Sequence, residues 1–398
     1  MEHSIQLYKE KKDCCGCGGC LNACPKNAIE MKEDAHGFLY PVIDPSLCVA
    51  CGLCKKVCAF QHETKFYPVI KTYVAVDTDE GRLLSAASGG IFSSIASSVV
   101  RDKGVAFGSA WKKTDNTIKA VHIPVQSEVA IKSLSGSKYV QSDTSQVFSQ
   151  VKDALKGGRT VLFSGTPCQV DALKAFLQYK EYENLYTIDL ICHGVPSGKM
   201  FSDYLSVLED HPIESYTFRD KKRGWGLQYA YQYAYQGKLV TKRYPSDISS
   251  YYHHFLLGNT YRENCYQCKY AKEMRCGDIT IGDYWGIEKE HPELVGEKSK
   301  INAGNGVSCI LVNSPKGQQL LERFGKELLL FPSEISKVSR WNHQLKEPSK
   351  PGKQRDYILQ LYETEGWPAV EKAFEKKRGL KYKLKKLMYC IRNRLSDK

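Results

Sequence analysis

The chain has 398 residues, of which 42% are hydrophobic and 25% charged. This is long enough for more than one folded unit, and the composition excludes a largely disordered chain. No apolar run approaches the roughly 18 to 20 residues that span a bilayer, and residues 1–13 lack the apolar core of an export signal. We therefore expect a cytoplasmic protein.

The net charge of +13 is concentrated at one end of the chain. Ten lysines and arginines lie after Glu375, where the one acidic residue is Asp397. The rest of the chain is only mildly basic, and this distribution argues against a nucleic-acid partner.

Cysteines dominate the first sixty residues. Four cysteines with the spacing C-x2-C-x2-C-x3-C begin at Cys14, and the same spacing returns at Cys48. Because cytoplasmic thiols are kept reduced, sixteen cysteines in such a chain favour metal binding over disulfides. In this spacing three thiolates hold one iron–sulfur cube, and the fourth reaches a second cube. Zinc is disfavoured, since it prefers paired C-x2-C knuckles separated by a longer gap.

Two [4Fe-4S] clusters are therefore predicted. The ligands of the first are Cys14, Cys17, Cys20 and Cys58, and those of the second are Cys48, Cys51, Cys54 and Cys24. Cys15 is interpreted as a bystander. We expect residues 1–64 to form a small α+β, two-cluster ferredoxin-like domain that needs its metals to fold.

Beyond the cysteine arrays, apolar strands alternate with amphipathic helices, which predicts an α/β domain over residues 69–330. Expected strands lie at 72–76, 104–109, 159–163, 185–191, 278–281 and 307–312. Helices are expected to follow Ser88, Ser145, Pro167, Ser197 and Pro315.

Two turns of this domain are candidates for anion binding. Ser88, Gly89 and Gly90 precede a predicted helix, whose first N–H groups could face a cofactor phosphate. A simple helix cap explains the same residues. In the turn 136–139, Lys138 is either a phosphate partner or a solvated lysine.

These turns occur together with the phrases 163–169, 192–194 and Cys265 to Cys268 leading into 282–286. With the dicluster motif, the set resembles the coenzyme F420 hydrogenase/dehydrogenase beta-subunit family, which includes proteins of bacterial polysaccharide gene clusters. The resemblance covers residues 14 to 315. It implies FAD together with iron–sulfur clusters. It also implies flavin contacts from Ser88, Gly89, Gly90, Gly136, Ser137, Lys138 and Tyr139.

Four later cysteines are candidates for a third [4Fe-4S] cluster, namely Cys168, Cys192, Cys265 and Cys268. The last two form a C-x2-C knuckle in a polar segment, and the first two follow predicted strands, where α/β folds collect functional groups. Zinc and buried, unreactive thiols are the alternatives, and Cys276 competes with Cys192 for a place. Cys309 and Cys390 are interpreted as structural.

His193 is the candidate catalytic residue. It follows Cys192 at the end of a predicted strand. It would protonate a reduced substrate or flavin, or else serve as a structural hydrogen-bond partner.

Residues 331–398 are expected to form a helical extension that ends in a basic amphipathic tail. Its apolar residues share one stripe of a helix, and they are Leu380, Leu384, Leu387, Met388, Ile391 and Leu395. We expect this stripe to pack on the body of the protein. Peripheral contact with an anionic membrane surface and contact with an acidic partner are the alternatives.

Together these patterns predict an iron–sulfur flavoprotein oxidoreductase. It would relay electrons between a reduced carrier, either ferredoxin or a deazaflavin such as coenzyme F420, and a small organic substrate. The alternative is an electron-transfer subunit that feeds a partner enzyme and has no substrate of its own.

Overall fold

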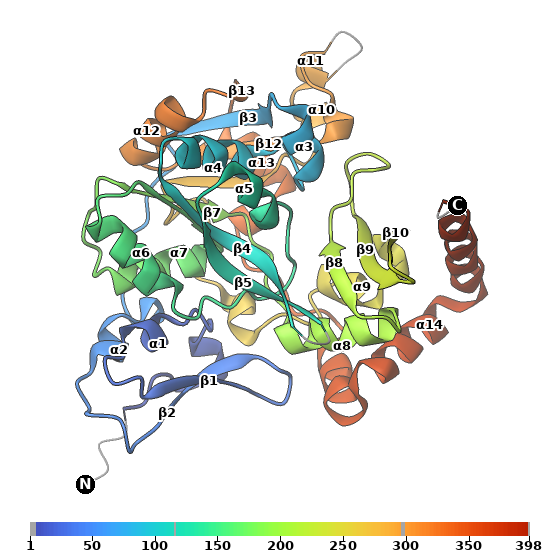
Figure 1. Ribbon diagram of the computed structural model, residues 1–398, viewed down its shortest axis with the longest axis horizontal. Helices are drawn as coiled ribbons and strands as arrows, with labels where there is room; N and C mark the ends of the chain where they lie inside the picture. The colour runs from blue at the N-terminus through green and yellow to red at the C-terminus, as the bar shows by residue number, and fades with distance from the viewer. Residues whose placement is uncertain (1–4, 115–116, 296–298, 397–398) are drawn as a thin grey trace.

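The computed structural model describes residues 5–114, 117–295 and 299–396. Residues 5–62 form a small α+β unit at one corner of the molecule (Figure 1). Its antiparallel strands are β1 (Ile29–Glu33) and β2 (Leu39–Ile43), and its short helices are η1 (Lys11–Asp13), α1 (Gly19–Ala23), α2 (Leu53–Lys56) and η2 (Ala59–Gln61). Gly18 and Gly52 precede α1 and α2 with φ of 70° and 74°. Glycine adopts this backbone conformation without the strain that a side chain would add.

A mixed eight-stranded sheet forms the body, in the order β13-β3-β12-β11-β7-β6-β4-β5. The strands are β3 (Lys71–Asp77), β4 (Val105–Lys113), β5 (Ile118–Val125), β6 (Val161–Gly165), β7 (Leu185–Leu190), β11 (Ile279–Asp283), β12 (Ser308–Val312) and β13 (Leu328–Ser333). The central strands β4, β6, β7 and β11 are parallel, and the outer pairings are antiparallel.

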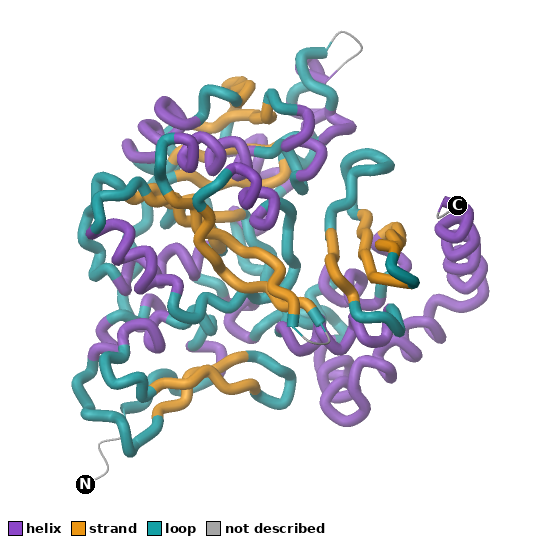
Figure 2. Tube along the Cα trace, in the orientation of Figure 1, coloured by secondary structure: helices purple, strands orange, loops and turns teal. Residues whose placement is uncertain are grey.

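Helices cover both faces of this sheet (Figure 2). Alternate residues of a strand point to opposite faces: Leu162 packs with α4 (Ile91–Arg101), α5 (Glu128–Leu134) and α12 (Pro315–Phe324), whereas Phe163 packs with α6 (Val147–Lys156) and α7 (Pro167–Phe176). The remaining short helices around the sheet are α3 (Glu80–Ser85), α10 (Ile287–Glu290), α11 (Pro292–Val295), η5 (Ala303–Asn305), α13 (Ile335–Trp341) and η6 (His343–Leu345). All the expected strands, and the helices after Ser88, Ser145, Pro167, Ser197 and Pro315, are present.

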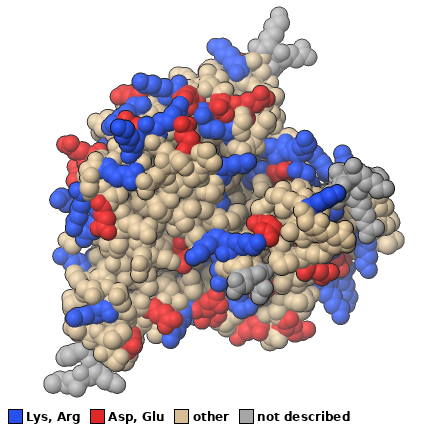
Figure 3. Space-filling view, viewed as in Figure 1, with Lys and Arg blue, Asp and Glu red and all other residues tan. Residues whose placement is uncertain are grey.

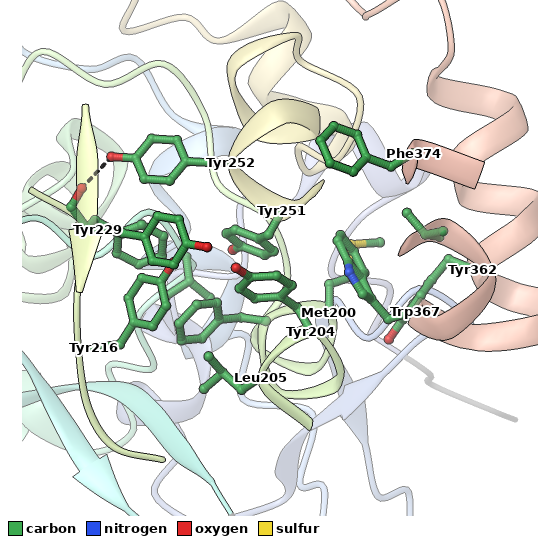
Figure 4. Close-up of a cluster of buried hydrophobic side chains, with 14 of the residues drawn as sticks. Met200, Tyr204, Leu205, Tyr216, Tyr229, Tyr251, Tyr252, Tyr362, Trp367 and Phe374 are labelled. Carbon is green, nitrogen blue, oxygen red and sulfur yellow. Dashed lines mark hydrogen bonds between the residues drawn. The ribbon is translucent and has the colours of Figure 1, made fainter. Parts of the chain in front are cut away.

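A second sheet stands beside the body, in the order β10-β9-β8. Its strands are β8 (Ile213–Thr217), β9 (Gln228–Tyr235) and β10 (Lys238–Pro245), and its helices are α8 (Gly198–Leu208), η3 (Ser246–Ile248), α9 (Ser250–Leu256), η4 (Glu263–Gln267) and α14 (Arg355–Ser396). Figure 4 shows the aromatic core between them, in which Tyr204, Tyr251 and Trp367 pack together. Gly366 and Gly379 interrupt α14 with non-helical backbone angles.

The fold class is therefore the expected one, an α/β domain preceded by a small α+β domain. One boundary differs, because β13 crosses residue 330 and pairs with β3, so the sheet continues past the expected end of the α/β domain. No helix among the described residues is long and apolar enough to cross a membrane.

Candidate functional site

The first predicted cysteine set gathers around one space in the small domain. Cys14, Cys17, Cys20 and Cys58 line it together. Burial raises the pKa of the Cys58 thiol to about 11, and the nearby thiols of Cys17 and Cys14 add to the shift. Burial and the neighbouring thiols likewise raise the pKa of Cys20 well above its usual value. Four thiols grouped in this way are the donor set that a four-iron cluster needs, and cluster binding would remove their protons.

The second set lies nearer the surface. Cys24, Cys48, Cys51 and Cys54 line one shallow space. Burial raises the pKa of Cys54, and the thiols of Cys51 and Cys24 raise it further. Cys51 is exposed, and Val49 and Leu53, which line the same space, are 59% and 36% exposed. The second set therefore has an apolar rim that faces solvent.

The third set forms where two parallel strands end. Cys168 lies at the start of α7 directly after β6, and Cys192 follows β7, whose Asp189 pairs with Gly165 of β6. Cys265 lies in η4, and Cys268 immediately follows that helix. Burial raises the pKa of Cys192 well above its usual value, and the thiols of Cys265, Cys168 and Cys268 add to the shift. The structure thus brings the four candidates together from three separate parts of the chain.

Cys276 does not join this set. It is buried, and its thiol donates to the carbonyl of Pro167 at 3.3 Å and to Asp189 Oδ2 at 3.5 Å. Cys309 is likewise buried, in β12.

Among the residues that the structure describes, no group of three or more His, Cys, Asp or Glu side chains is arranged to hold a metal ion by itself.

Cys15, interpreted from the sequence as a bystander rather than a cluster ligand, lies close to cysteines of two different sets. It is buried, and it lines both the space of the first set and the large cavity described below. Hydrogen bonds to Cys168 and Cys17 raise the pKa of its thiol well above the usual value. One thiol therefore lies between a residue of the first set and a residue of the third.

A cluster ligand and a cysteine that binds no cluster should respond differently to replacement by serine. We expect Cys51→Ser to lower bound iron by about four atoms per chain, because one ligand of the second cluster is lost. Cys15→Ser should leave the iron content nearly unchanged, since neither predicted set uses Cys15. Iron and acid-labile sulfide assays on anaerobically purified protein measure both. Equal losses in the two variants would show that the assignment of ligands around Cys14 is wrong.

Three side chains of the body hold the loop of the first set in place. Gln141 Nε2 donates to the carbonyls of Cys15 and Gly16 at 2.9 and 3.2 Å, and Thr144 Oγ1 donates to the carbonyl of Cys17 at 2.7 Å. The buried Arg262 donates through Nε to the Cys14 carbonyl at 2.8 Å. Its guanidinium also lies 3.8 Å from Cys14 Sγ, where its positive charge would favour an anionic cluster.

A cavity of about 280 Å³ lies on the other side of Cys15, at the carboxyl ends of β6, β7 and β11. This edge of a parallel sheet is where α/β folds bind ligands. The third cysteine set contributes Cys168, Cys192 and Cys265 to its wall. Six of the seven residues predicted to contact flavin also line it, namely Ser88, Gly90, Gly136, Ser137, Lys138 and Tyr139.

Gly89, the seventh, lies outside this lining. Its N–H donates to Ser308 Oγ at 2.8 Å, and a Cβ at this position would lie 2.5 Å from the carbonyl oxygen of Ala75. Glycine is therefore needed here for close packing of the turn against the sheet. The expectation that Gly89 contacts a cofactor is not supported.

The Lys138 side chain is hydrogen-bonded to backbone carbonyls. Its Nζ donates to the last carbonyls of α5 and the following turn, including Leu134 at 3.2 Å and Ser135 at 2.9 Å. Burial lowers the pKa of Lys138 to about 7. The side chain closes the C-terminus of a helix, so neither the phosphate role nor the solvated role describes it. The Ser88 hydroxyl similarly donates to the carbonyl of Val307 at 2.7 Å.

His193 directly follows Cys192 and also lines the cavity, as do Asp283 and Trp285. Burial lowers the pKa of His193, although the Asp283 carboxylate opposes the shift. Asp283 accepts from Arg219 at 2.8 Å, and Trp285 stacks on Trp225 with ring centroids 4.8 Å apart. The part of the cavity around Asp283 and Trp285 is therefore polar and aromatic, and it is held by an ion pair whose arginine is buried.

Two further cavity residues gave no local sequence signal. His122 is buried, with Nδ1 2.8 Å from Ser142 Oγ and Nε2 3.0 Å from the carbonyl of Ser164, and burial lowers its pKa to about 4. Ser109 Oγ is buried and has no hydrogen-bond partner among the described residues.

Residues 158–336 match the family described as the C-terminal part of the beta subunit of coenzyme F420 hydrogenase/dehydrogenase. Residues 13–62 match the 4Fe-4S dicluster domain. Residues 158–336 thus carry the C-terminal domain of the F420 hydrogenase/dehydrogenase beta-subunit family, and residues 13–62 carry a 4Fe-4S dicluster domain. The family match covers β6, β7 and β11 and the third cysteine set, and the dicluster match covers the first two sets. The family supports iron–sulfur clusters and an oxidoreductase role.

A chain in a solved structure titled as a xenon derivative of the F420-reducing [NiFe] hydrogenase complex from Methanosarcina barkeri is similar to this chain. The two are 16% identical, with a TM-score of 0.38, over 77% of this chain and 91% of that one. No curated protein matches.

Proposed function

We propose that this member of the beta-subunit family is an FAD-dependent, iron–sulfur oxidoreductase. It relays electrons between a reduced carrier and a small organic substrate through three four-iron clusters. The carrier is a protein such as ferredoxin or a deazaflavin such as coenzyme F420.

The shared cavity carries this proposal. Cysteines of the third set line this cavity together with the turns at Ser88 and Gly136 and with His193, which directly follows Cys192. A cofactor in this space would contact a cluster ligand without an intervening layer of protein. Cys15 extends the contact to the first set. Cys54 of the second set also lines the space of the first set, so the three sets form a series from the exposed rim at Cys51 to the cavity.

FAD in this cavity would supply the exchange between a two-electron hydride and single electrons. The groups suited to hold it are the backbone N–H groups at the start of α4 and the loop at Gly136 and Ser137. Lys221 holds the turn before α4 in place, because its Nζ donates to the carbonyls of Leu83 and Ser88. His193 lines the same cavity, where it would protonate the reduced substrate or flavin.

Anaerobic purification followed by cofactor analysis tests this function. We expect one flavin per chain and about twelve irons, at four irons for each four-thiolate site. Reduction of the clusters should be followed by reduction of the flavin in rapid-mixing spectra. A chain that keeps its irons but binds no flavin when FAD is supplied would contradict the proposal.

A second function has one observation in its favour. The apolar rim around Cys51 suits a protein partner, and a subunit without its own substrate would pass electrons there to another enzyme. This function predicts that the chain oxidises the reduced carrier only when the partner enzyme is present. Turnover of a small-molecule acceptor by the isolated, flavin-loaded chain would reject it.

A further inference from the structure

The last segment of α14, after the break at Gly379, exposes its apolar stripe. Leu380 is 72% exposed and Ile391 is 49% exposed, and Leu384, Leu387 and Met388 lie between these values. The side chain of Leu395 lies outside what the structure describes, as does Asp397. The expectation that the stripe packs on the body is therefore wrong for these five residues. In Figure 1 the segment stands at the edge of the molecule, far from the small domain.

The opposite face of the same segment contacts the body. Tyr382 is buried and its hydroxyl donates to the carbonyl of Ile248 at 3.0 Å. Asn393 bonds both backbone groups of Arg243, accepting from its N–H at 3.1 Å and donating to its carbonyl at 3.2 Å. Tyr389 packs on Tyr244. The helix is thus fixed by one face, and its stripe points outward.

Positively charged side chains flank the apolar stripe on both sides. At about 100° per residue, Lys381 and Arg392 flank one side of the stripe and Lys383 flanks the other, and all three are exposed. Lys385 and Lys386, which turn toward the body, pair with Asp247 at 2.6 Å and Glu375 at 2.7 Å. No acidic residue lies between Lys376 and Ser396. Lys and Arg are visible along this edge in Figure 3.

We propose that this face binds the surface of an anionic phospholipid bilayer. An apolar stripe with cations on both flanks fits the boundary between acyl chains and acidic headgroups, where apolar side chains enter the bilayer and lysine and arginine reach its phosphates. An acidic protein would pair with the cations but would leave five large apolar side chains in water. A second copy would bring the same cations together. The bilayer satisfies both features at once.

Vesicle co-sedimentation of the cofactor-loaded full chain tests the proposal. We expect binding to phosphatidylcholine vesicles that contain phosphatidylglycerol, and binding at least about tenfold weaker to phosphatidylcholine alone. The variants L384Q/M388Q and K381Q/K383Q/R392Q should each weaken binding at least about tenfold, and added salt should weaken it further. The matched control V129Q/L329Q removes two exposed apolar side chains elsewhere and should bind as the unchanged protein does.

The remaining outcomes decide against a bilayer. Equal binding by L384Q/M388Q and the unchanged protein would overturn the proposal. So would stripe-dependent self-association without vesicle binding, which would make the occupant a second copy. Binding to an acidic redox protein but not to acidic vesicles would identify a protein partner instead. Iron content and thermal midpoint, measured on every variant, distinguish loss of binding from loss of fold.

Discussion

Replacing Cys265 and Cys268 together with serine is expected to remove about four of about twelve irons and to stop electron transfer between the small domain and the cavity. Both thiols belong to the set that includes Cys168 and Cys192. The first two sets lie in the other domain and should keep their irons. The measurements are iron per chain, electron paramagnetic resonance of the reduced protein, and the rate at which cluster electrons reach bound flavin.

Cys276→Ser is the matched control for this experiment. Cys276 is a buried thiol of the same region, but it bonds Pro167 and Asp189 and lies outside the set. We expect it to leave the iron content unchanged. Full iron after the double change would return Cys265 and Cys268 to a structural role, and zinc in the unchanged protein would make the knuckle a structural metal site.

A second large effect is expected at the buried ion pair of Arg275 and Asp189. The atoms Nη2 and Oδ1 lie 3.0 Å apart, and the side chains are 2% and 0% exposed. Asp189 also accepts from Thr280 and from the N–H of Gly277. Arg275→Met leaves this carboxylate buried without its cation, which typically costs about 3 to 5 kcal/mol. The arginine also donates to the carbonyls of Tyr270 and Lys272, so the segment after Cys268 would lose its support.

Thermal and urea unfolding, followed with cofactors bound, measure this loss. Arg323→Met is the control, because Arg323 pairs with Asp102 at 2.6 Å with both side chains about half exposed. Exposed pairs contribute about 0 to 1 kcal/mol, so this variant should unfold almost as the unchanged protein does. Equal destabilisation by the two changes would show that burial of Asp189 is not what makes its partner necessary.

Short-range patterns in the sequence predicted the parts of the site that are local. The first two cysteine sets lie within one compact segment, so spacing alone indicates their grouping, and the strand–turn–helix pattern placed Cys168 and Cys192 at strand ends. Arg262 and Gln141 could not be predicted, because each meets the cysteine loop from more than a hundred positions away. The same limit applied to Gly89, whose tight contact is with Ser308.

The packing of the C-terminal tail also depends on residues that are far apart in the sequence. Helical periodicity identified the apolar stripe of Leu380 to Ile391, but it does not determine which face packs. That choice is made by Tyr382 and Asn393, whose partners lie on η3 and β10. Hydrogen bonds to backbone groups far along the chain leave no periodic signal, so periodicity could not show that the face with Tyr382, Tyr389 and Asn393 packs on the body.

The attachment of the cysteine loop through Gln141, Thr144 and Arg262 has a consequence for rates. Many electron carriers swing on a linker, and their transfer slows in viscous solvent because the carrier must diffuse between docking positions. Here the small domain is hydrogen-bonded to residues of the body, so under the proposed function the tunnelling distance inside the chain would be set by this fixed geometry rather than by diffusion. Solvent viscosity would then act only on encounters with outside molecules, and the internal hops would proceed at the same speed in glycerol as in water.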